Sequence, residues 1–329
     1  MLVASPETCL LRRRYDPAAL LAAHPPVLRH ANKQLAFALA CPPHAVHRGT
    51  IELTRWDTAR LPTTCATRPI EVTARGTYYD YAGDDRGVWH VNFADPELFV
   101  AYGSPLLAQD ELQAVEHPLL GCLREALRAE GVVARTEVDH RATPVLIRGV
   151  ERRAALDTAP RLDDGRLYGL YGNRFAGAAP AAIRGALRLL DPPTTTNLIA
   201  IAAPAGGRGP YFTHQLERIL TTAYTGFAAA AHESRAAWPD APVVVATGFW
   251  GCGAFGGNRR AMVCLQLLAA RLAGVAGVRF YAGDAPGLDD FRAGAADLDR
   301  VLADDDAPTA AVLDAVGDLE YAWGTPDGT

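Results

Sequence analysis

The sequence predicts an α/β protein in which a β-sheet carries helices on both faces. Short apolar runs alternate with helical patterns from residue 70 onward, and a glycine-rich loop stands between one such run and one such helix. Strands that alternate with helices are typical of this layered class. The 329 residues are 49% hydrophobic and 21% charged, which is enough apolar material for one large buried core.

Each expected element depends on a local pattern. Residues 1–66 combine a helical pattern near Pro17–Ala40, a strand-like run at Thr50–Thr54 and a Thr/Pro-rich connector, and we expect them to form an accessory cap. Residues 67–329 are expected to form the main domain. Its strands are predicted at 70–73, 88–93, 144–150, 197–202, 243–246 and 278–281, and its helices near 109–128, 181–190, 213–234 and 258–273. The Gly/Asp/Tyr-rich stretch Ala159–Gly177 is long enough for a functional lid.

Charge and cysteine content disfavour several protein classes. A formal net charge of −5 opposes strong nonspecific binding to nucleic acid. No apolar segment has the length of a membrane span or a secretory signal, so we expect no membrane partner. The six cysteines include no C-x-x-C pair, which predicts a reduced cytoplasmic protein without structural zinc. Arginine carries almost all the basic charge, as is typical of a GC-rich bacterial genome.

The glycine-rich loop is the most informative stretch. It follows the apolar run Val243–Ala246 and precedes the helical pattern Asn258–Leu272. Glycines let the backbone approach a ligand closely, and the N–H groups at a helix start favour phosphate. We therefore expect this loop to bind a diphosphate. Its residues are Gly251, Cys252, Gly253, Ala254, Phe255, Gly256 and Gly257.

Three other classes of protein bind phosphate groups through comparable sites, and the sequence disfavours each of them. Lys33 is the only lysine, so the loop lacks the G-K-[ST] ending of NTP hydrolases, and the Ala/Leu-rich surroundings of Lys33 do not indicate a pyridoxal site. The pattern G-x-G-x-x-G also fits an NAD-dependent oxidoreductase, with Asp284 as the acidic residue. The loop lies in the last third of the chain, however, which leaves little room for a dinucleotide domain.

A second group of polar residues lies upstream. Asn92 and Asp95 stand at the end of a predicted strand, and Gln109, Asp110 and Glu111 begin a predicted helix after thirteen intervening residues. Ligands of open α/β sheets bind outside the carboxyl ends of the strands, so we expect these residues and the glycine loop to share one pocket. Residues 110 and 111 are about 100° apart on a helix, so only one of them can point into that pocket.

Taken together, these segments resemble the poly(ADP-ribose) glycohydrolases over roughly residues 85–300. The resemblance implies a macrodomain-like fold with a mixed β-sheet between helices, and metal-independent hydrolysis of a ribosyl glycosidic bond. It implies ADP-ribose or an ADP-ribosylated substrate as the partner and no cofactor, and we expect a monomer. The matching segments are Val91–Asp95, Gln109–Glu111, Thr221–Phe227, Thr247–Gly257 and Cys264–Ala270.

The resemblance also implies roles for individual residues. Glu111 matches the second glutamate of the family's Gln-Glu-Glu signature, which acts as acid and then as base, and Asp110 matches the first. Asn92 and Asp95 match an Asp and an Asn near the distal ribose, with the two types exchanged. Phe255 and its loop match the segment that holds the diphosphate and the distal ribose.

Two departures alter the expected pocket. The family's triple glycine ahead of Gln-Glu-Glu is replaced by Phe99–Ser104, and its Asn before Trp-Gly-Cys-Gly is Phe249.

Tyr168, Tyr171 and Tyr281 are candidates for stacking on adenine, with Tyr281 assigned to the ligand site.

The expected chemistry follows from the bond that is cleaved. Hydrolysis of a ribosyl bond passes through an oxocarbenium-like state and needs an acid for the leaving atom and a base for water. One carboxyl group, Glu111, can serve both roles in turn if its pKa is raised by burial or by Asp110. The alternatives are a module that binds ADP-ribose without cleaving it, an oxidoreductase, and an ordinary solvated first helical turn. What the ADP-ribose is attached to stays open.

Overall fold

The computed structural model describes residues 8–65, 68–81, 86–163, 165–302 and 306–328. Its centre is an eight-stranded sheet with the order β1-β2-β7-β8-β4-β9-β10-β3. The strands are β1 (Cys9–Tyr15), β2 (Ile51–Trp56), β3 (Glu71–Arg75), β4 (Val88–Phe93), β7 (Val145–Leu156), β8 (Leu187–Ile201), β9 (Val244–Gly248) and β10 (Gly277–Tyr281), and a small hairpin comprises β5 (Glu137–Val138) and β6 (Arg141–Ala142).

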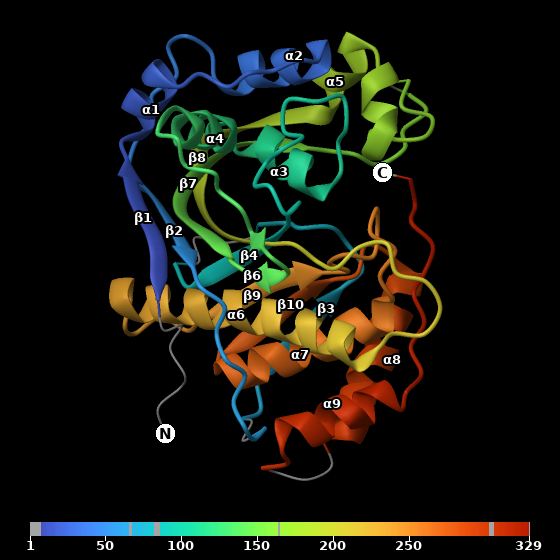
Figure 1. Cartoon of the computed structure of the whole chain (residues 1–329). Helices are drawn as coiled ribbons and strands as arrows, with labels where there is room; N and C mark the ends of the chain where they lie inside the picture. Colours follow the sequence, from blue (N-terminus) through green and yellow to red (C-terminus); the bar gives the residue numbers. More distant parts are fainter. Residues whose placement is uncertain (1–7, 66–67, 82–85, 164, 303–305, 329) are drawn as a thin grey trace.

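Helices cover both faces of this sheet (Figure 1). One layer contains α1 (Pro17–Ala23), α2 (Ala31–Ala40), α3 (Gln109–Glu116), α4 (Leu119–Ala129) and α5 (Pro180–Ala186). The other layer contains α6 (Thr213–Ala237), α7 (Arg259–Ala273), α8 (Ala285–Val301) and α9 (Thr309–Gly317). The predicted α/β sandwich is therefore confirmed.

Alternation along the strands produces a hydrophobic core on each face of the sheet. Ile199 and Ile201 of β8 belong to the cluster that includes α6 and α7, whereas Leu198 and Ala200 belong to the cluster that includes α4. Successive side chains of a strand point to opposite faces, so a strand that is apolar at every position is buried on both.

The sheet is mixed, and its parallel half sets the location of the site. β4 pairs in parallel with β8 and β9, and β10 pairs in parallel with β9 and β3. The pairs β1–β2, β2–β7 and β7–β8 are antiparallel. The carboxyl ends of β4, β9 and β10 consequently meet at one edge of the sheet, where ligands of α/β proteins bind.

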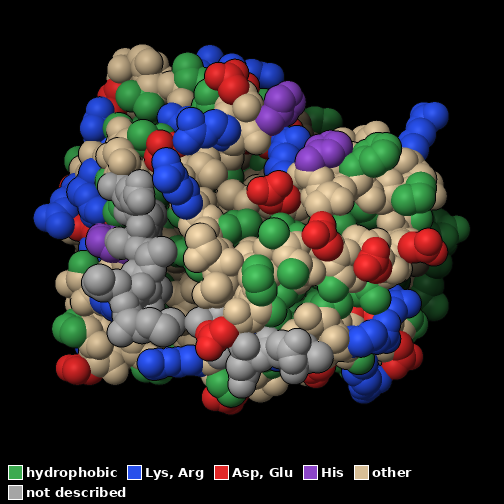
Figure 2. Space-filling view, turned by 60° about the horizontal axis from the view of Figure 1, so that its bottom comes forward, with side chains coloured by type: hydrophobic (Ala, Val, Ile, Leu, Met, Phe, Trp, Pro, Cys, Tyr) green, Lys and Arg blue, Asp and Glu red, His purple; other side chains and the backbone are tan. Residues whose placement is uncertain are grey.

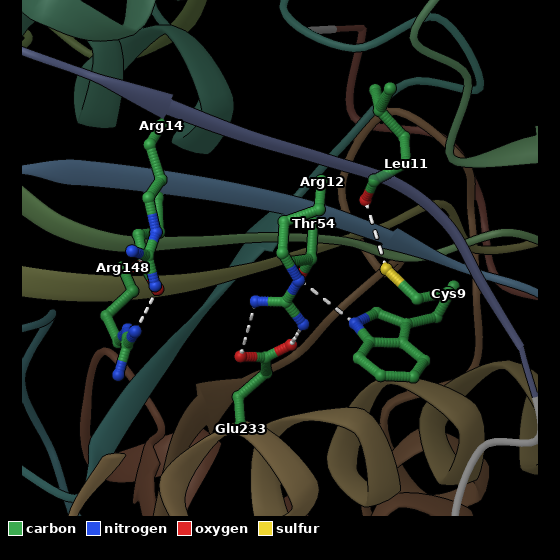
Figure 3. A network of polar contacts seen from close by, with 9 residues as sticks. Cys9, Leu11, Arg12, Arg14, Thr54, Arg148 and Glu233 are labelled. Carbon is green, nitrogen blue, oxygen red and sulfur yellow. Dashed lines mark hydrogen bonds and ion pairs between the residues drawn. The ribbon is translucent and has the colours of Figure 1, made fainter. Parts of the chain in front are cut away.

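The N-terminal segment contributes two strands to this sheet. β1 pairs with β2, and β2 pairs with β7. Figure 3 shows Arg12 of β1 reaching Glu233 of α6, with an N–O distance of 2.6 Å. The expected boundary between residues 66 and 67 lies outside the described residues, and a separate cap function for 1–66 stays a prediction.

Several predicted boundaries were wrong, each for a local reason. The helix expected over 17–40 is two helices separated by Pro25 and Pro26, and the one expected over 109–128 is interrupted at Pro118. Proline lacks the N–H that continues a helix and disfavours helical geometry in the residue before it. The helix expected over 181–190 ends at Ala186, where β8 takes over. The elements β1, β5, β6, α8 and α9 were not predicted.

The surface carries both signs of charge. On the face shown in Figure 2, acidic and basic side chains lie among one another. Among the described residues, no helix combines the length and the apolar character needed to span a bilayer.

Candidate functional site

A cavity of about 410 Å³ opens at the carboxyl ends of the central strands. β4 contributes Phe93, β9 contributes Gly248 and the loop that follows it, and β10 contributes Tyr281. One face of α3, the loop residues 157–159 and Tyr171 complete the wall. The strand ends and the glycine loop therefore meet in one site, where the topology predicts it.

The first half of the glycine loop lines this cavity. Gly251–Phe255 are lining residues, whereas Gly256 and Gly257 are not among them. Gly251 has φ of 76°, and a Cβ built on it would lie 2.4 Å from the Cβ of Ala203, so only glycine fits this turn. The loop is closed by the hydrogen bond from Gly257 N to Gly251 O at 2.8 Å.

Helix α7 begins directly after the loop. The side chain of Asn258 caps it by accepting a hydrogen bond from Ala261 N at 3.1 Å. Arg259, the first helical residue, lines the cavity, and its guanidinium lies 4.7 Å from the ring centre of Phe249 and 3.1 Å from Asp290. Arg259 was not among the predicted site residues, although a basic residue at the start of a helix after a phosphate loop is a usable signal.

Cys252 lines the cavity but is not activated. Burial raises the pKa of its thiol, so the group is protonated at neutral pH and has little nucleophilic character. Its Sγ contacts the carbonyl oxygen of Trp250 at 3.7 Å. The side chain serves the packing of the loop.

Helix α3 presents one face to the cavity. Gln109, Leu112, Gln113 and Glu116 line it, which is the i, i+3, i+4, i+7 spacing of one helical face. The side chain of Gln109 accepts a hydrogen bond from Phe93 N at 2.7 Å and donates one to Val91 O at 3.2 Å. Gln109 therefore fixes the end of β4 against the start of α3.

The four other polar residues predicted for the pocket lie together but are not among its lining residues. Asn92 is fully buried, and its Nδ2 donates to Asp110 Oδ1 at 2.9 Å. Glu111 Oε2 accepts from Ala108 N at 2.9 Å, and Asp95 Oδ1 accepts from Glu97 N at 2.9 Å. The expectation that residue 110 or 111 points into the cleft is not met in this conformation, because residues 109, 112, 113 and 116 occupy that face.

The two acidic residues of α3 lie in a buried, charged environment. Asp110 is 6% exposed and Glu111 is 4% exposed. Burial raises the pKa of Asp110, and the neighbouring Glu111 raises it further. Burial also raises the pKa of Glu111, against the opposing effect of Lys33. Both carboxyl groups therefore hold a proton to higher pH than in water.

Lys33 of α2 accompanies this pair. It is 2% exposed, its Nζ has no hydrogen-bond partner among the described residues, and the ring centre of Phe175 lies 5.5 Å away. Burial lowers the pKa of Lys33 to about 8, although Glu111 and Asp110 oppose that shift. The only lysine of the chain is thus an internal counter-charge for the acidic pair.

Tyr171 lines the cavity beside the start of α3. Gly172 exchanges two backbone hydrogen bonds with Leu107, of 2.9 and 3.2 Å, which holds the 159–177 loop at this point. The Tyr171 phenol lies beside the backbone of Gln109, and burial raises its pKa. Its ring stacks on Tyr78 with centroids 6.4 Å apart. The expected lid therefore borders the cavity on the side of Glu111.

Several tyrosines form an aromatic wall of the cavity. Tyr281 lines the cavity, its ring meets Tyr79 edge to face at 5.0 Å, and its hydroxyl donates to Asp80 Oδ1 at 2.7 Å. Tyr79 donates to Val91 O at 2.9 Å. Tyr81 carries the guanidinium of Arg152 at 4.1 Å from its ring centre. Only Tyr281 of these residues was predicted.

A buried ion pair contributes to the cavity wall through Glu116. Arg152 Nε donates to Glu116 Oε2 at 2.8 Å, and Leu156 N donates to the other oxygen at 2.9 Å. His90 and His117 lie beside it, and burial lowers the pKa of each to about 3, so both are neutral. In the described part of the chain, no group of three or more His, Cys, Asp or Glu side chains is arranged to hold a metal ion.

Comparison with known proteins identifies relatives of this chain. Residues 193–288 match the model of a family described as poly(ADP-ribose) glycohydrolase (PARG), macro domain fold. The PARG of Thermomonospora curvata bound to the inhibitor ADP-HPD is 19% identical, with a TM-score of 0.46 over 87% of this chain and 84% of that one. The PARG of Deinococcus radiodurans in complex with ADP-ribose is 14% identical, with a TM-score of 0.44 over 87% and 94%. No curated protein matches.

The family match contains the central part of the site. It begins within β8, runs through α6, β9 and α7, and ends in α8, so it includes the whole glycine loop that lines the cavity. The resemblance seen in the sequence is thereby confirmed. This part of the chain is therefore similar to the poly(ADP-ribose) glycohydrolase family with a macro domain fold.

Proposed function

We propose that this protein is an ADP-ribosyl glycohydrolase, which releases ADP-ribose by acid–base hydrolysis of a ribosyl glycosidic bond. The observation that carries this proposal is the glycine loop, which lies within the family match and lines a cavity at the carboxyl ends of the parallel strands. No metal or cofactor enters the proposed reaction.

The cavity has parts suited to each portion of ADP-ribose. Backbone N–H groups of Gly253–Phe255 and the guanidinium of Arg259 suit the diphosphate. The rings of Tyr79 and Tyr281 form an apolar wall of the kind that adenine contacts. The distal ribose would then lie toward the start of α3, where Gln109 and Tyr171 are found.

Glu111 is the proposed acid and base. Its raised pKa keeps a proton available, which Glu111 donates to the leaving oxygen or nitrogen as the bond to the anomeric carbon breaks. The resulting carboxylate then takes a proton from the water that attacks this carbon, and the proton on Glu111 is restored. For this contact the Tyr171 ring has to move from the start of α3, since Glu111 does not line the cavity in the present conformation.

Asp110 and Asn92 are proposed as positioning residues. Asn92 Nδ2 donates both to Asp110 Oδ1 and to Gln113 Oε1, each at 2.9 Å, and this network holds the first turn of α3 against β4. Glu116 lines the cavity but is less suited to catalysis, because Arg152 and Leu156 already engage its two oxygens.

A binding module without catalysis is the second candidate. It is favoured by one observation, the hydrogen bond that occupies the Glu111 carboxylate at Ala108 N. An oxidoreductase ranks third, since Asp284 uses its carboxylate to cap α8 through Gly287 N at 2.7 Å.

One experiment separates these functions. Mono-ADP-ribosylated peptides and oligonucleotides, poly(ADP-ribose) and NAD are assayed for free ADP-ribose with the wild type, Glu111→Gln and the exposed control Glu320→Gln. We expect Glu111→Gln to lose about 10²–10⁴-fold in rate while calorimetry shows unchanged affinity for ADP-ribose. Normal turnover by this variant would refute the assignment. Binding without turnover of any substrate by the wild type would establish the binding module.

We also infer that the protein acts as a monomer in a bacterial cytoplasm. The six cysteines are all free, as is typical of proteins in a reducing cytoplasm, and this supports the setting.

A further inference from the structure

The residues Gly324–Gly328, which we call the strap, lie on the glycine loop. Gly324 N donates to Gly256 O at 2.8 Å, and Asp327 N approaches Gly253 O at 3.4 Å. Pro326 sits so close to Gly256 that a Cβ on this glycine would lie 2.9 Å from the proline ring. Figure 1 shows the end of the chain, in red, running along the outside of the molecule from α9 toward the 159–177 loop.

The carboxylate of Asp327 stands beside the loop residues that face the cavity. Asp327 is a lining residue, and its Oδ2 lies 3.2 Å from the position that a Cβ on Gly253 would take. The cavity wall also contains the acidic residues Glu116, Asp157 and Asp284, with Arg259 as the basic one. A carboxylate at this place is negatively charged, so it repels a diphosphate that approaches the same loop.

The strap is exposed, and contacts at both of its ends hold it in place. Trp323, just before it, is buried and stacks on Tyr211 with centroids 4.3 Å apart, and its backbone N–H donates to Gly209 O at 2.9 Å. Residues 324–328 themselves are exposed. At the far end, Asn173 of the 159–177 loop donates to Gly328 O at 2.8 Å. The same loop carries Tyr171, so the strap is tied to the segment that places Tyr171 beside the start of α3.

We propose that the strap occupies the anion-binding face of the glycine loop and has to leave before a diphosphate binds, with Asp327 as the competing anion. This inference rests on the proposed function, because it takes ADP-ribose as the ligand. Departure of the strap would also release the hydrogen bond between Asn173 and Gly328. Binding at the glycine loop and movement of Tyr171 are thereby linked through one contact.

The test measures the affinity of two ligands by calorimetry. The variants are Asp327→Asn, which removes the charge and keeps the shape, a chain shortened after Trp323, and the control Asp318→Asn in the exposed turn after α9. We expect Asp327→Asn and the shortened chain to bind ADP-ribose about tenfold more tightly than the wild type, a difference of about 1.4 kcal/mol. Adenosine, which lacks phosphate, should bind all four proteins equally.

Ionic strength gives a second readout. The advantage of Asp327→Asn should shrink toward 1 M salt, where the Debye length is about 3 Å and exposed charges are screened. If the wild type binds ADP-ribose and both Asp327→Asn and the shortened chain bind it no more tightly, the proposed role of the strap is refuted. The proposed function of the protein is then unaffected. If neither the wild type nor the shortened chain binds ADP-ribose, the proposed function itself fails, and the inference with it.

Discussion

The carboxylate of Glu111 accepts a hydrogen bond of 2.9 Å from the backbone N–H of Ala108. Ala108 is the residue before α3, and Glu111 is the third residue of this helix. The Glu111 side chain therefore satisfies one of the N–H groups that a helix start leaves without a partner. The group proposed as acid and base is therefore also a structural cap. Stability and activity can be separated by substitution at this position.

Glu111→Gln and Glu111→Ala should differ in stability. Glutamine keeps an oxygen that accepts from Ala108 N, whereas alanine leaves this N–H without its partner, so we expect the alanine variant to be about 1 kcal/mol less stable than the glutamine variant. Urea unfolding measures the difference. Equal stabilities would show that the cap contributes nothing, while both variants should lose turnover.

Gly251→Ala should disrupt the glycine loop. The substitution combines a φ of 76° with a contact of 2.4 Å between the new Cβ and that of Ala203. We expect a loss of about 2–4 kcal/mol from backbone strain and overpacking together. Gly206→Ala is the matched control, because Gly206 has φ of 75° and nothing within 4 Å, and it should lose only the backbone part, about 1–2 kcal/mol. Equal losses in thermal or urea unfolding would contradict the steric argument.

Asp110 should make stability depend on pH. Burial and the neighbouring Glu111 raise its pKa to about 8 in the folded protein, above the ordinary value of 3.8. A group with a raised pKa stabilises the fold below its unfolded value and loses that contribution as pH rises through the folded value. Wild-type stability should therefore decline between about pH 4 and pH 8.

Asp110→Asn provides the check on this pH dependence. Asparagine keeps the oxygen that accepts from Asn92 and cannot ionise, so the decline in the free energy of unfolding between pH 5 and pH 8 should be less steep. Identical pH profiles for the wild type and the variant, measured by urea unfolding, would rule out Asp110 as the source.

The ion pair between Glu116 and Arg152 should show strong coupling. Both side chains are buried and joined at 2.8 Å, so Glu116→Gln or Arg152→Met alone leaves a buried partner uncompensated and should cost about 3–5 kcal/mol. The double variant should lose clearly less than the sum of the two. A double-mutant cycle in urea measures the coupling, and additive losses would mean that the pair acts as two independent residues.

Elements with a clear local pattern could be predicted from the sequence. β4 was expected at residues 88–93 and is found there, and the helix expected at 258–273 is α7. Both have apolar residues at the spacing of their own secondary structure and polar or glycine residues at their ends. The strand β1, with three consecutive arginines, lacks that pattern. It forms because β2 supplies its hydrogen-bond partners and because residues such as Glu130 and Glu233 pair with its arginines.

The sequence by itself determined the layered α/β class, the glycine loop between β9 and α7, and the presence of an acidic pair at the start of α3. Each of these is encoded by residues close together in the chain. Only the tertiary structure decided which face of α3 looks into the cavity, that Lys33 lies buried near Glu111, and that the strap covers Gly253 and Gly256. These relationships join residues far apart in sequence, and they depend on how whole elements pack, which no local pattern records.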